Sequence, residues 1–164
     1  MKKLFLIFII APIWGFGQEV YLNGMTINAP EGFVRSDAMG ENVILWIKFN
    51  EYDNASDYIT FFNIEENTDL SLAEKNCKKG TRTTEFIKFT NIKINNISFP
   101  ICFQKGDNDL LISNFYYKKN GFTYVVYCNT YDGTDEKFKS SEFKDPYENI
   151  EYMVGYMAAK LLVQ

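Results

Sequence analysis

The sequence contains no histidine. Histidine is the side chain most often used for proton transfer near neutral pH, and it is the commonest ligand of transition metals. Its absence excludes Ser-His-Asp and Cys-His nucleophilic sites and His-based zinc sites built from this chain alone. Carboxylate pairs, Ser-Lys pairs and calcium sites stay open. The composition therefore favours a protein that is not an enzyme.

The carboxylates follow no catalytic or metal-binding spacing either. The loops Asp107–Asp109 and Asp132–Glu136 lack the alternating ligands and the closing Glu of an EF-hand, and their composition is typical of turns. Acids clustered in loops are usually solvated. Acids that could still form a pair for glycoside chemistry are Glu65-Glu66 and the group Glu51, Asp53 and Asp57. We predict no metal, no cofactor and no catalytic residue, and we keep a histidine-free carboxylate hydrolase as an alternative.

Cysteine is scarce, with three widely spaced residues and no CxxC pair. The spacing indicates neither a thioredoxin-type redox site nor a zinc knuckle. We expect Cys77, Cys102 and Cys128 to be buried thiols that act as small apolar residues. One disulfide plus one buried thiol is the alternative, in which Cys77 reaches one of the other two. No disulfide is predicted to be required for folding, so melts with and without reductant should coincide.

Only one long apolar run is present, Leu4 to Ile13, and it is too short to span a membrane. Lys2 and Lys3 precede it, and small residues follow at Gly15 and Gly17, the pattern of a secretory signal peptide. We predict cleavage between Gly17 and Gln18, which leaves 18–164 as a single domain. The mature protein is expected to be exported, periplasmic or secreted, and it has no N-terminal cysteine for lipid attachment.

Positive charge is also in short supply. The chain has a net charge of −4, and removal of the two leader lysines leaves fifteen basic against twenty-one acidic residues, a net charge of −6. An acidic domain repels nucleic acid and anionic membrane surfaces. The basic residues are scattered along the mature sequence, with Lys78-Lys79 and Lys118-Lys119 as the only doublets. We predict no nucleic-acid partner and no stable membrane insertion after processing.

What the sequence does have is a series of β-branched and aromatic runs separated by turn signals, which predict strands. Asn120-Gly121 is the strongest hairpin signal, because a type I′ turn needs a positive φ at both central residues. Consecutive strands joined by short turns form antiparallel sheets. After a short N-terminal strand or hairpin, the expected strands are Val43–Phe49, Tyr58–Ile64, Phe86–Ile94, Ile97–Gln104, Leu110–Tyr117 and Phe122–Thr130.

Two helices complete the predicted architecture. The first runs from Ser71 to about Lys79, opens with a capping box and ends at Gly80. The second is long and C-terminal, and it begins at Asp145-Pro146. Its core-facing stripe consists of Ile150, Met153, Val154, Met157 and Leu161. Helices packed on the faces of an antiparallel sheet make an α+β layered domain.

Three segments resemble PsbP-like domains. Gly24-Met-Thr-Ile-Asn-Ala-Pro-Glu-Gly-Phe33 resembles their opening strand and turn, and Ser71-Leu-Ala-Glu74 is similar to the start of their first helix. Ile92-Lys-Ile-Asn-Asn-Ile-Ser-Phe-Pro100 resembles their strand-turn-strand passage, with Asn95-Asn96 in place of Asn-Gly. The resemblance implies a PsbP-like layered sandwich. It also implies a non-catalytic binding or accessory protein, of the kind often exported in bacteria.

The aromatic content suggests where such a protein would bind. If Asn120-Gly121 is the turn, Tyr117 pairs with Tyr124 and Phe115 with Val126, which makes that face of the sheet the apolar one. The other face mixes aromatic rings with hydroxyl and amide groups, as binding surfaces do. The candidate binding surface consists of Trp46, Lys48, Asn114, Tyr116, Tyr127 and Asn129. The alternative is that a helix covers this face.

These observations predict an exported, non-catalytic binding or accessory module that recognises a protein or cell-envelope component. Two alternatives remain. One is an immunity or inhibitor protein, whose acidic charge would suit a basic partner enzyme. The other is the carboxylate hydrolase.

Overall fold

The computed structural model describes residues 19–22, 25–36, 43–64, 71–119, 121–131, 135, 137–140 and 145–163. The predicted signal peptide and its cleavage site, Gly17 and Gln18, lie outside the described residues. So do Glu65-Glu66 and most of the Asp132–Glu136 loop.

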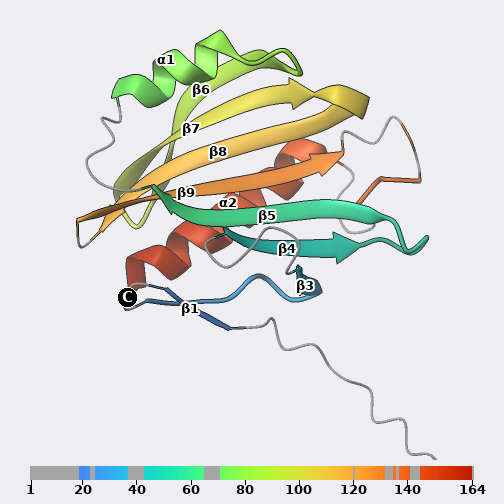
Figure 1. Cartoon of the computed structure of the whole chain (residues 1–164), viewed down its shortest axis with the longest axis horizontal. Helices are drawn as coiled ribbons and strands as arrows, with labels where there is room; N and C mark the ends of the chain where they lie inside the picture. Colours follow the sequence, from blue (N-terminus) through green and yellow to red (C-terminus); the bar gives the residue numbers. More distant parts are fainter. Residues whose placement is uncertain are drawn as a thin grey trace, which may run out of the picture.

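The chain folds as an α+β domain around a seven-stranded antiparallel sheet (Figure 1). The strands lie in the order β3-β4-β5-β9-β8-β7-β6, and a two-stranded ribbon, β1 with β2, lies beside the sheet. The strands are β1 (Val20–Leu22), β2 (Met25–Ile27), β3 (Phe33–Ser36), β4 (Val43–Phe49), β5 (Ala55–Ile64), β6 (Thr84–Ile94), β7 (Ile97–Gly106), β8 (Leu110–Lys119) and β9 (Phe122–Tyr131).

Every strand expected from Val43 onward is confirmed, because local turn chemistry fixes the hairpins. Asn95 and Asn96 both have positive φ, 49° and 64°, the conformation that a two-residue type I′ turn requires. In the next hairpin Gly121 has a φ of 82°, and Lys119 pairs with Phe122. That register confirms the predicted pairs Tyr117 with Tyr124 and Phe115 with Val126.

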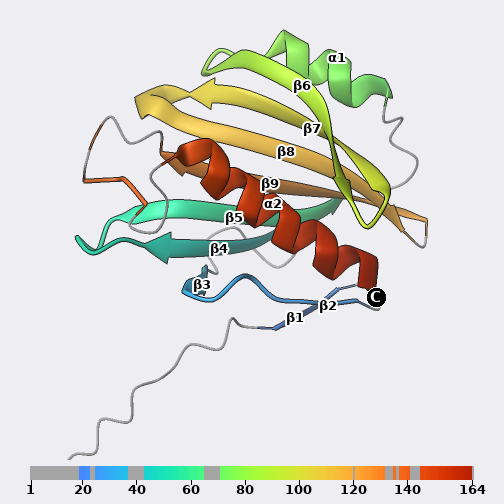
Figure 2. The same cartoon turned by 180° about the vertical axis from the view of Figure 1, so that it is seen from behind.

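Helix α2 (Pro146–Val163) covers one face of the sheet, as Figure 2 shows. Asp145 caps it, because its Oδ1 accepts a 2.8 Å hydrogen bond from the Tyr147 backbone N–H. All five residues of the predicted stripe, from Ile150 to Leu161, are fully buried. They belong to one hydrophobic core together with aromatic and aliphatic side chains of β4, β5, β7, β8 and β9. No helix in the described part of the chain is long and apolar enough to cross a membrane.

Helix α1 (Ser71–Lys79) lies along β6 and β7 and is bonded covalently to β7. Cys77 and Cys102 form a disulfide, with their Cα atoms 5.8 Å apart. The prediction of three buried thiols is therefore wrong for these two residues, while Cys128 is a buried free thiol. Cys102 and Cys128 are separated by β8, as expected. Cys102 is too far from Cys128 across the sheet to form a bond, and it pairs instead with Cys77 of α1.

Two polar contacts reinforce this attachment. Gln104 Nε2 donates a 3.0 Å hydrogen bond to the Cys77 carbonyl, which also accepts from the Gly80 N–H. Gly80 has a φ of 58°, and a Cβ at this position would lie 2.6 Å from the Thr84 carbonyl oxygen. Only glycine fits a helix end this close to the next strand.

Candidate functional site

The structure divides the six residues of the predicted binding surface between the two faces of the sheet. Asn114, Tyr116, Tyr127 and Asn129 lie together on the face away from α2. Trp46 lies on the opposite face, has no exposed surface and belongs to the core beneath α2. Lys48 shares that face, with its Nζ 5.9 Å from the centroid of the Phe33 ring. The inclusion of Trp46 and Lys48 was therefore wrong.

The error lies in which face of β4 is buried. Alternation along β4 places Val43, Leu45, Ile47 and Phe49 on one face and Trp46 with Lys48 on the other. In the sheet Trp46 pairs with Ile59, which pairs with Cys128, so this row continues the face that α2 covers. Phe49 is instead 47% exposed. Alternation along one strand gives two faces, but only the neighbouring strands decide which one the helix covers.

Two further tyrosines, Tyr58 and Tyr131, lie on the same face as the four remaining residues, and the sequence analysis did not include them. Tyr58 on β5 pairs with Asn129, and the Tyr58 ring lies edge-on to Tyr131 with centroids 6.4 Å apart. β5 and β9 are far apart in the sequence, so no local signal indicates their pairing. We call the combined set the tyrosine face: Tyr58, Asn114, Tyr116, Tyr127, Asn129 and Tyr131.

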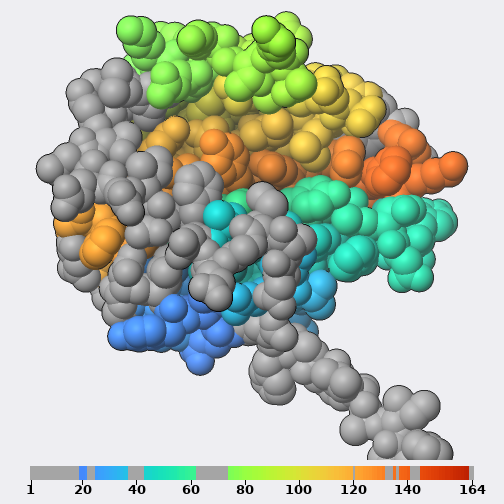
Figure 3. Space-filling model, viewed as in Figure 1, coloured from blue at the N-terminus to red at the C-terminus, as the bar shows by residue number. Residues whose placement is uncertain are grey.

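Three neighbouring strands carry the tyrosine face, and Asn114 and Tyr127 are direct cross-strand partners within it. In the space-filling view, β5, β9 and β8 form adjacent bands on this side of the molecule (Figure 3). Asn114 is 7% exposed, while the other five residues are half-buried. Four half-buried tyrosine rings thus lie on this face, with their backbones fixed by the centre of the sheet.

The segment 137–140 supports one end of the tyrosine face. Phe138 packs on Tyr131 with ring centroids 5.0 Å apart. The buried Asn50 side chain holds the segment by donating to the carbonyls of Lys137 and Lys139, at 2.8 and 3.0 Å. The same side chain accepts hydrogen bonds from two backbone N–H groups of its own turn. One amide therefore fixes both the β4–β5 turn and the support for Tyr131.

Burial raises the pKa of three tyrosines of the tyrosine face, Tyr58, Tyr116 and Tyr127. Desolvation raises the pKa of Tyr127, and desolvation followed by the nearby Tyr127 raises that of Tyr116. For Tyr58, desolvation and then its interaction with Tyr131 raise the pKa to about 12. A phenol that stays neutral can both donate and accept a hydrogen bond. The tyrosine face therefore offers neutral hydrogen-bonding groups.

We expect a measurable alkaline limit to stability from Tyr58. The folded protein holds the Tyr58 proton more tightly than the unfolded chain, whose tyrosine pKa is 10. The resulting stabilisation is fully present below pH 10 and is lost as the pH rises towards about 12. Denaturant melts across this range, with phenolate absorbance recorded in parallel, measure the effect. Tyr58→Phe should lose less stability across the same pH range. If its stability falls with pH as steeply as that of the wild type, the effect does not come from Tyr58.

Within the described part of the chain, one buried side-chain atom of the tyrosine face has no hydrogen-bond partner. The Asn129 side-chain oxygen is buried and accepts no hydrogen bond. An unsatisfied buried acceptor costs free energy, and most such atoms in folded proteins do have partners. Asn129 pairs with Tyr58 on one side and with Ile112 on the other, so it occupies the middle of the surface.

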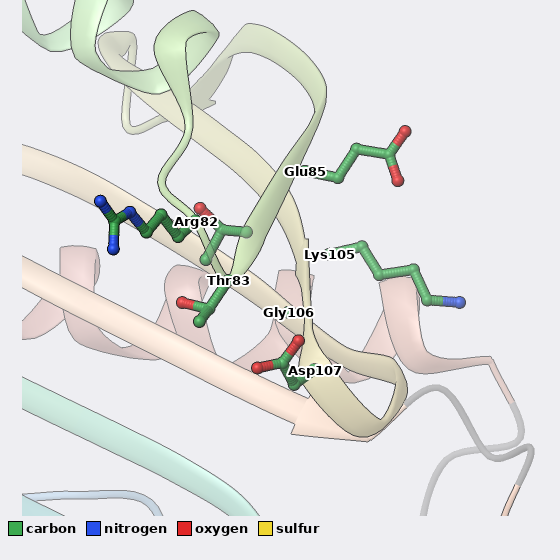
Figure 4. A pocket seen from close by; sticks show the side chains of 7 residues that line it. Arg82, Thr83, Glu85, Lys105, Gly106 and Asp107 are labelled. Atoms are coloured by element: carbon green, nitrogen blue, oxygen red, sulfur yellow. The ribbon is translucent and has the colours of Figure 1, made fainter.

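A shallow hollow of about 290 Å³ lies at another part of the molecule, where β6 begins and β7 ends. Its lining side chains diverge: Glu85 and Lys105 point to one side and Arg82 to the other (Figure 4). Lys105 Nζ also forms an ion pair with Asp109. Functional pockets bring polar groups together around a bound molecule. This arrangement does not, so the hollow provides no catalytic geometry.

Of the carboxylates proposed for hydrolytic chemistry, Glu51, Asp53 and Asp57 lie among the described residues. Glu51 and Asp53 are exposed in the β4–β5 turn. Asp57 was expected in a solvated loop, but it lies in β5 beneath α2 and is 1% exposed. Its carboxyl group accepts hydrogen bonds from Ser56, Thr130 and Asn149. No group of three candidate metal ligands occurs among the described residues.

No protein-family model and no curated protein matches the sequence. Two solved structures are similar in shape. One is a protein of unknown function, PA94 from Pseudomonas aeruginosa, with 10% identity over 71% of this chain and 84% of that chain and a TM-score of 0.43. The other is a mutant of the protein Mog1, with 13% identity over 90% of this chain and 93% of that chain and a TM-score of 0.47. At TM-scores below 0.5, neither likeness carries a functional conclusion.

Proposed function

We propose that this protein is an exported, non-catalytic binding module that recognises a protein or cell-envelope component through the tyrosine face. The observation that carries the proposal is the position of four half-buried tyrosine rings on the sheet face opposite α2. Flat aromatic area supplies contact at a small cost in side-chain entropy. The tyrosine hydroxyl groups supply specificity.

The disulfide supports the export part of the proposal. Disulfides persist in oxidising compartments and are rare in the cytosol of most organisms. The Cys77–Cys102 bond therefore agrees with the signal-peptide pattern at Lys2 to Gly17. We place the mature protein in the periplasm or outside the cell, beginning at Gln18.

PsbP-like packing is part of the same proposal. The resemblance in the sequence implies a layered sandwich, and the sheet with α2 on one face and α1 beside β6 and β7 is compatible with it. The functional expectation that accompanies this resemblance is a binding or accessory role. Fold alone does not give function, so the proposal rests on the tyrosine face.

An immunity or inhibitor protein is the second candidate, favoured by charge. The mature chain carries six more acidic than basic residues, and that balance would speed association with a basic enzyme. In this case the tyrosine face would occlude an active site. The two candidates differ in one observable, which is whether the captured partner is an enzyme that loses activity when bound.

Capture of partners by the immobilised mature protein tests the proposed function. We expect Tyr116→Ala and Tyr127→Ala to retain roughly a tenth or less of the wild-type capture from envelope extract, since aromatic anchors dominate interfaces. Capture is compared at a temperature where circular dichroism shows each variant to be folded. Tyr52→Ala is the matched control, because Tyr52 is 60% exposed in the β4–β5 turn. Equal capture by all four proteins would refute the tyrosine face as the binding surface.

A further inference from the structure

A second surface, at the edge of the sheet beside α1, is suited to a different kind of contact. β6 is the terminal strand of the seven-stranded sheet, and within the described part of the chain it pairs with β7 only. Figures 1 and 2 both show it as the outermost strand, next to α1. The outer edge of such a strand presents backbone N–H and C=O groups that an extended polypeptide can pair with.

This edge is basic in a chain that is otherwise strongly acidic. Residues 71–94, which include α1 and β6, carry six basic and two acidic side chains. The rest of the chain carries eleven basic and nineteen acidic side chains. All six basic residues are exposed. The local charge along this edge is therefore positive, although the net charge of the whole chain is negative.

Most of this charge is not neutralised locally. Lys78 pairs with Glu74 at 2.6 Å, an exposed pair of little energetic value. Lys88 Nζ lies 4.6 Å from the Phe103 ring centroid. Among the described residues, Lys75, Lys79, Arg82 and Lys93 have neither a carboxylate nor an aromatic ring as a partner. Lys75 and Lys79 lie on α1, Arg82 precedes β6, and Lys93 lies near the end of β6.

The edge also offers apolar contact. Phe86 and Ile87 are each 36% exposed, at a bulge in the β6–β7 ladder between Phe86 and Lys88. Ile97, at the other end of the hairpin, is 46% exposed. A ligand that alternates acidic and apolar side chains would therefore meet both kinds of partner along β6.

A second copy of this chain does not fit the same edge. Two copies meeting edge to edge would place like-charged surfaces against each other, and pairing that sets Lys88 opposite Lys93 puts like charges in direct contact. Edge lysines and bulges are devices that prevent such self-pairing. The edge lysines do not repel a negatively charged partner.

We infer that the outer edge of β6, flanked by the cationic side of α1, binds an extended acidic polypeptide segment as an added strand. Backbone pairing with β6 supplies the contact, and Lys75, Lys79, Arg82 and Lys93 select for carboxylates. This site is separate from the tyrosine face and does not depend on it.

The test uses the mature, disulfide-bonded protein and a fluorescein-labelled peptide of alternating Glu and Val, followed by fluorescence anisotropy at low salt. We expect saturable binding that weakens as salt is added. The same peptide N-methylated on every second amide keeps its charge but cannot pair as a strand, and should lose at least about tenfold in affinity. Hydrogen exchange of the β6 amides should slow when the unmodified peptide binds.

Two double variants isolate the charge contribution. Lys75→Glu with Lys93→Glu should weaken binding by at least about tenfold. Lys118→Glu with Lys137→Glu makes the same change in net charge elsewhere on the surface and should bind as the wild type does. Tyr116→Ala should also bind normally, which keeps this result separate from the tyrosine face.

Three results would overturn the inference: no binding of the Glu-Val peptide, equal binding of its N-methylated form, or slowed exchange away from β6. Oligothymidylate and anionic phosphatidylglycerol vesicles are tested in parallel. Binding of either as tight as that of the peptide would show a general polyanion surface instead.

Discussion

Reduction of the Cys77–Cys102 bond should lower the free energy of unfolding by about 3 to 4 kcal/mol, the loop-closure value for a bridge of this span. The two cysteines are 25 residues apart, and the bond closes a loop containing the end of α1 and all of β6. Opening it restores to the unfolded chain the freedom that the bridge removes. This expectation replaces the sequence-based one of coincident melts.

Thermal melts of the mature protein with and without reductant measure this effect, which corresponds to a fall of roughly 10 °C in Tm for a domain of this size. The double variant Cys77→Ser with Cys102→Ser should melt at the lower temperature in both conditions. Because Cys128 is a free, buried thiol, it makes no contribution to the difference. If oxidised and reduced wild-type protein melt together, the bond does not stabilise the fold.

Reduction should also act locally before it acts globally. Apart from the disulfide, the Cys77 end of α1 is held by the Gln104 hydrogen bond to the Cys77 carbonyl. Amide exchange in α1 and at the start of β6 should therefore accelerate more than exchange in β5, β8 and β9, which form the middle of the sheet.

Replacement of Asp57 by Ala should cost about 3 to 5 kcal/mol, the range found when one partner of a buried polar group is removed. The Asp57 carboxyl group joins three elements, because it accepts hydrogen bonds from Thr130 on β9, from Asn149 on α2 and from its neighbour Ser56. Asn149 also donates to the Thr130 hydroxyl at 2.9 Å. Alanine would leave all three donors buried without this acceptor.

Urea melts of a short series test this assignment. Asp57→Asn keeps one side-chain oxygen as an acceptor, so its loss should be smaller than that of Asp57→Ala. Glu51→Ala removes an exposed carboxylate from the adjacent turn and should stay within about 0.5 kcal/mol of wild type. An Asp57→Ala protein as stable as Glu51→Ala would show that the network does not hold α2 to the sheet.

Much of the local structure was predictable from the sequence. The caps and stops at Asp145 and Gly80, the alternating runs and the two-residue turns act over a few neighbouring residues. The same is true of the β8–β9 register, since a two-residue hairpin fixes the pairing of both strands. For this reason the helices, the strands from β4 onward and the partners of Phe115 and Tyr117 were all correctly expected.

Contacts between distant segments were decided by the tertiary structure. Alternation gave β4 two faces, but its pairing with β5 and β9 put Trp46 under α2 and left Phe49 exposed. The long-range pairing of β5 with β9 brought Tyr58 beside Asn129 and placed Asp57 in the core.

The disulfide and the basic edge have the same origin. Cys77 reached Cys102 because α1 packs along β7, and basic residues scattered between Lys75 and Lys93 became one surface because α1 lies beside β6. The sequence by itself determined the elements, their ends and the hairpin registers, because these depend on neighbouring residues. Which faces are covered and which charges and cysteines meet depended on packing between distant segments, and no local pattern encodes that packing.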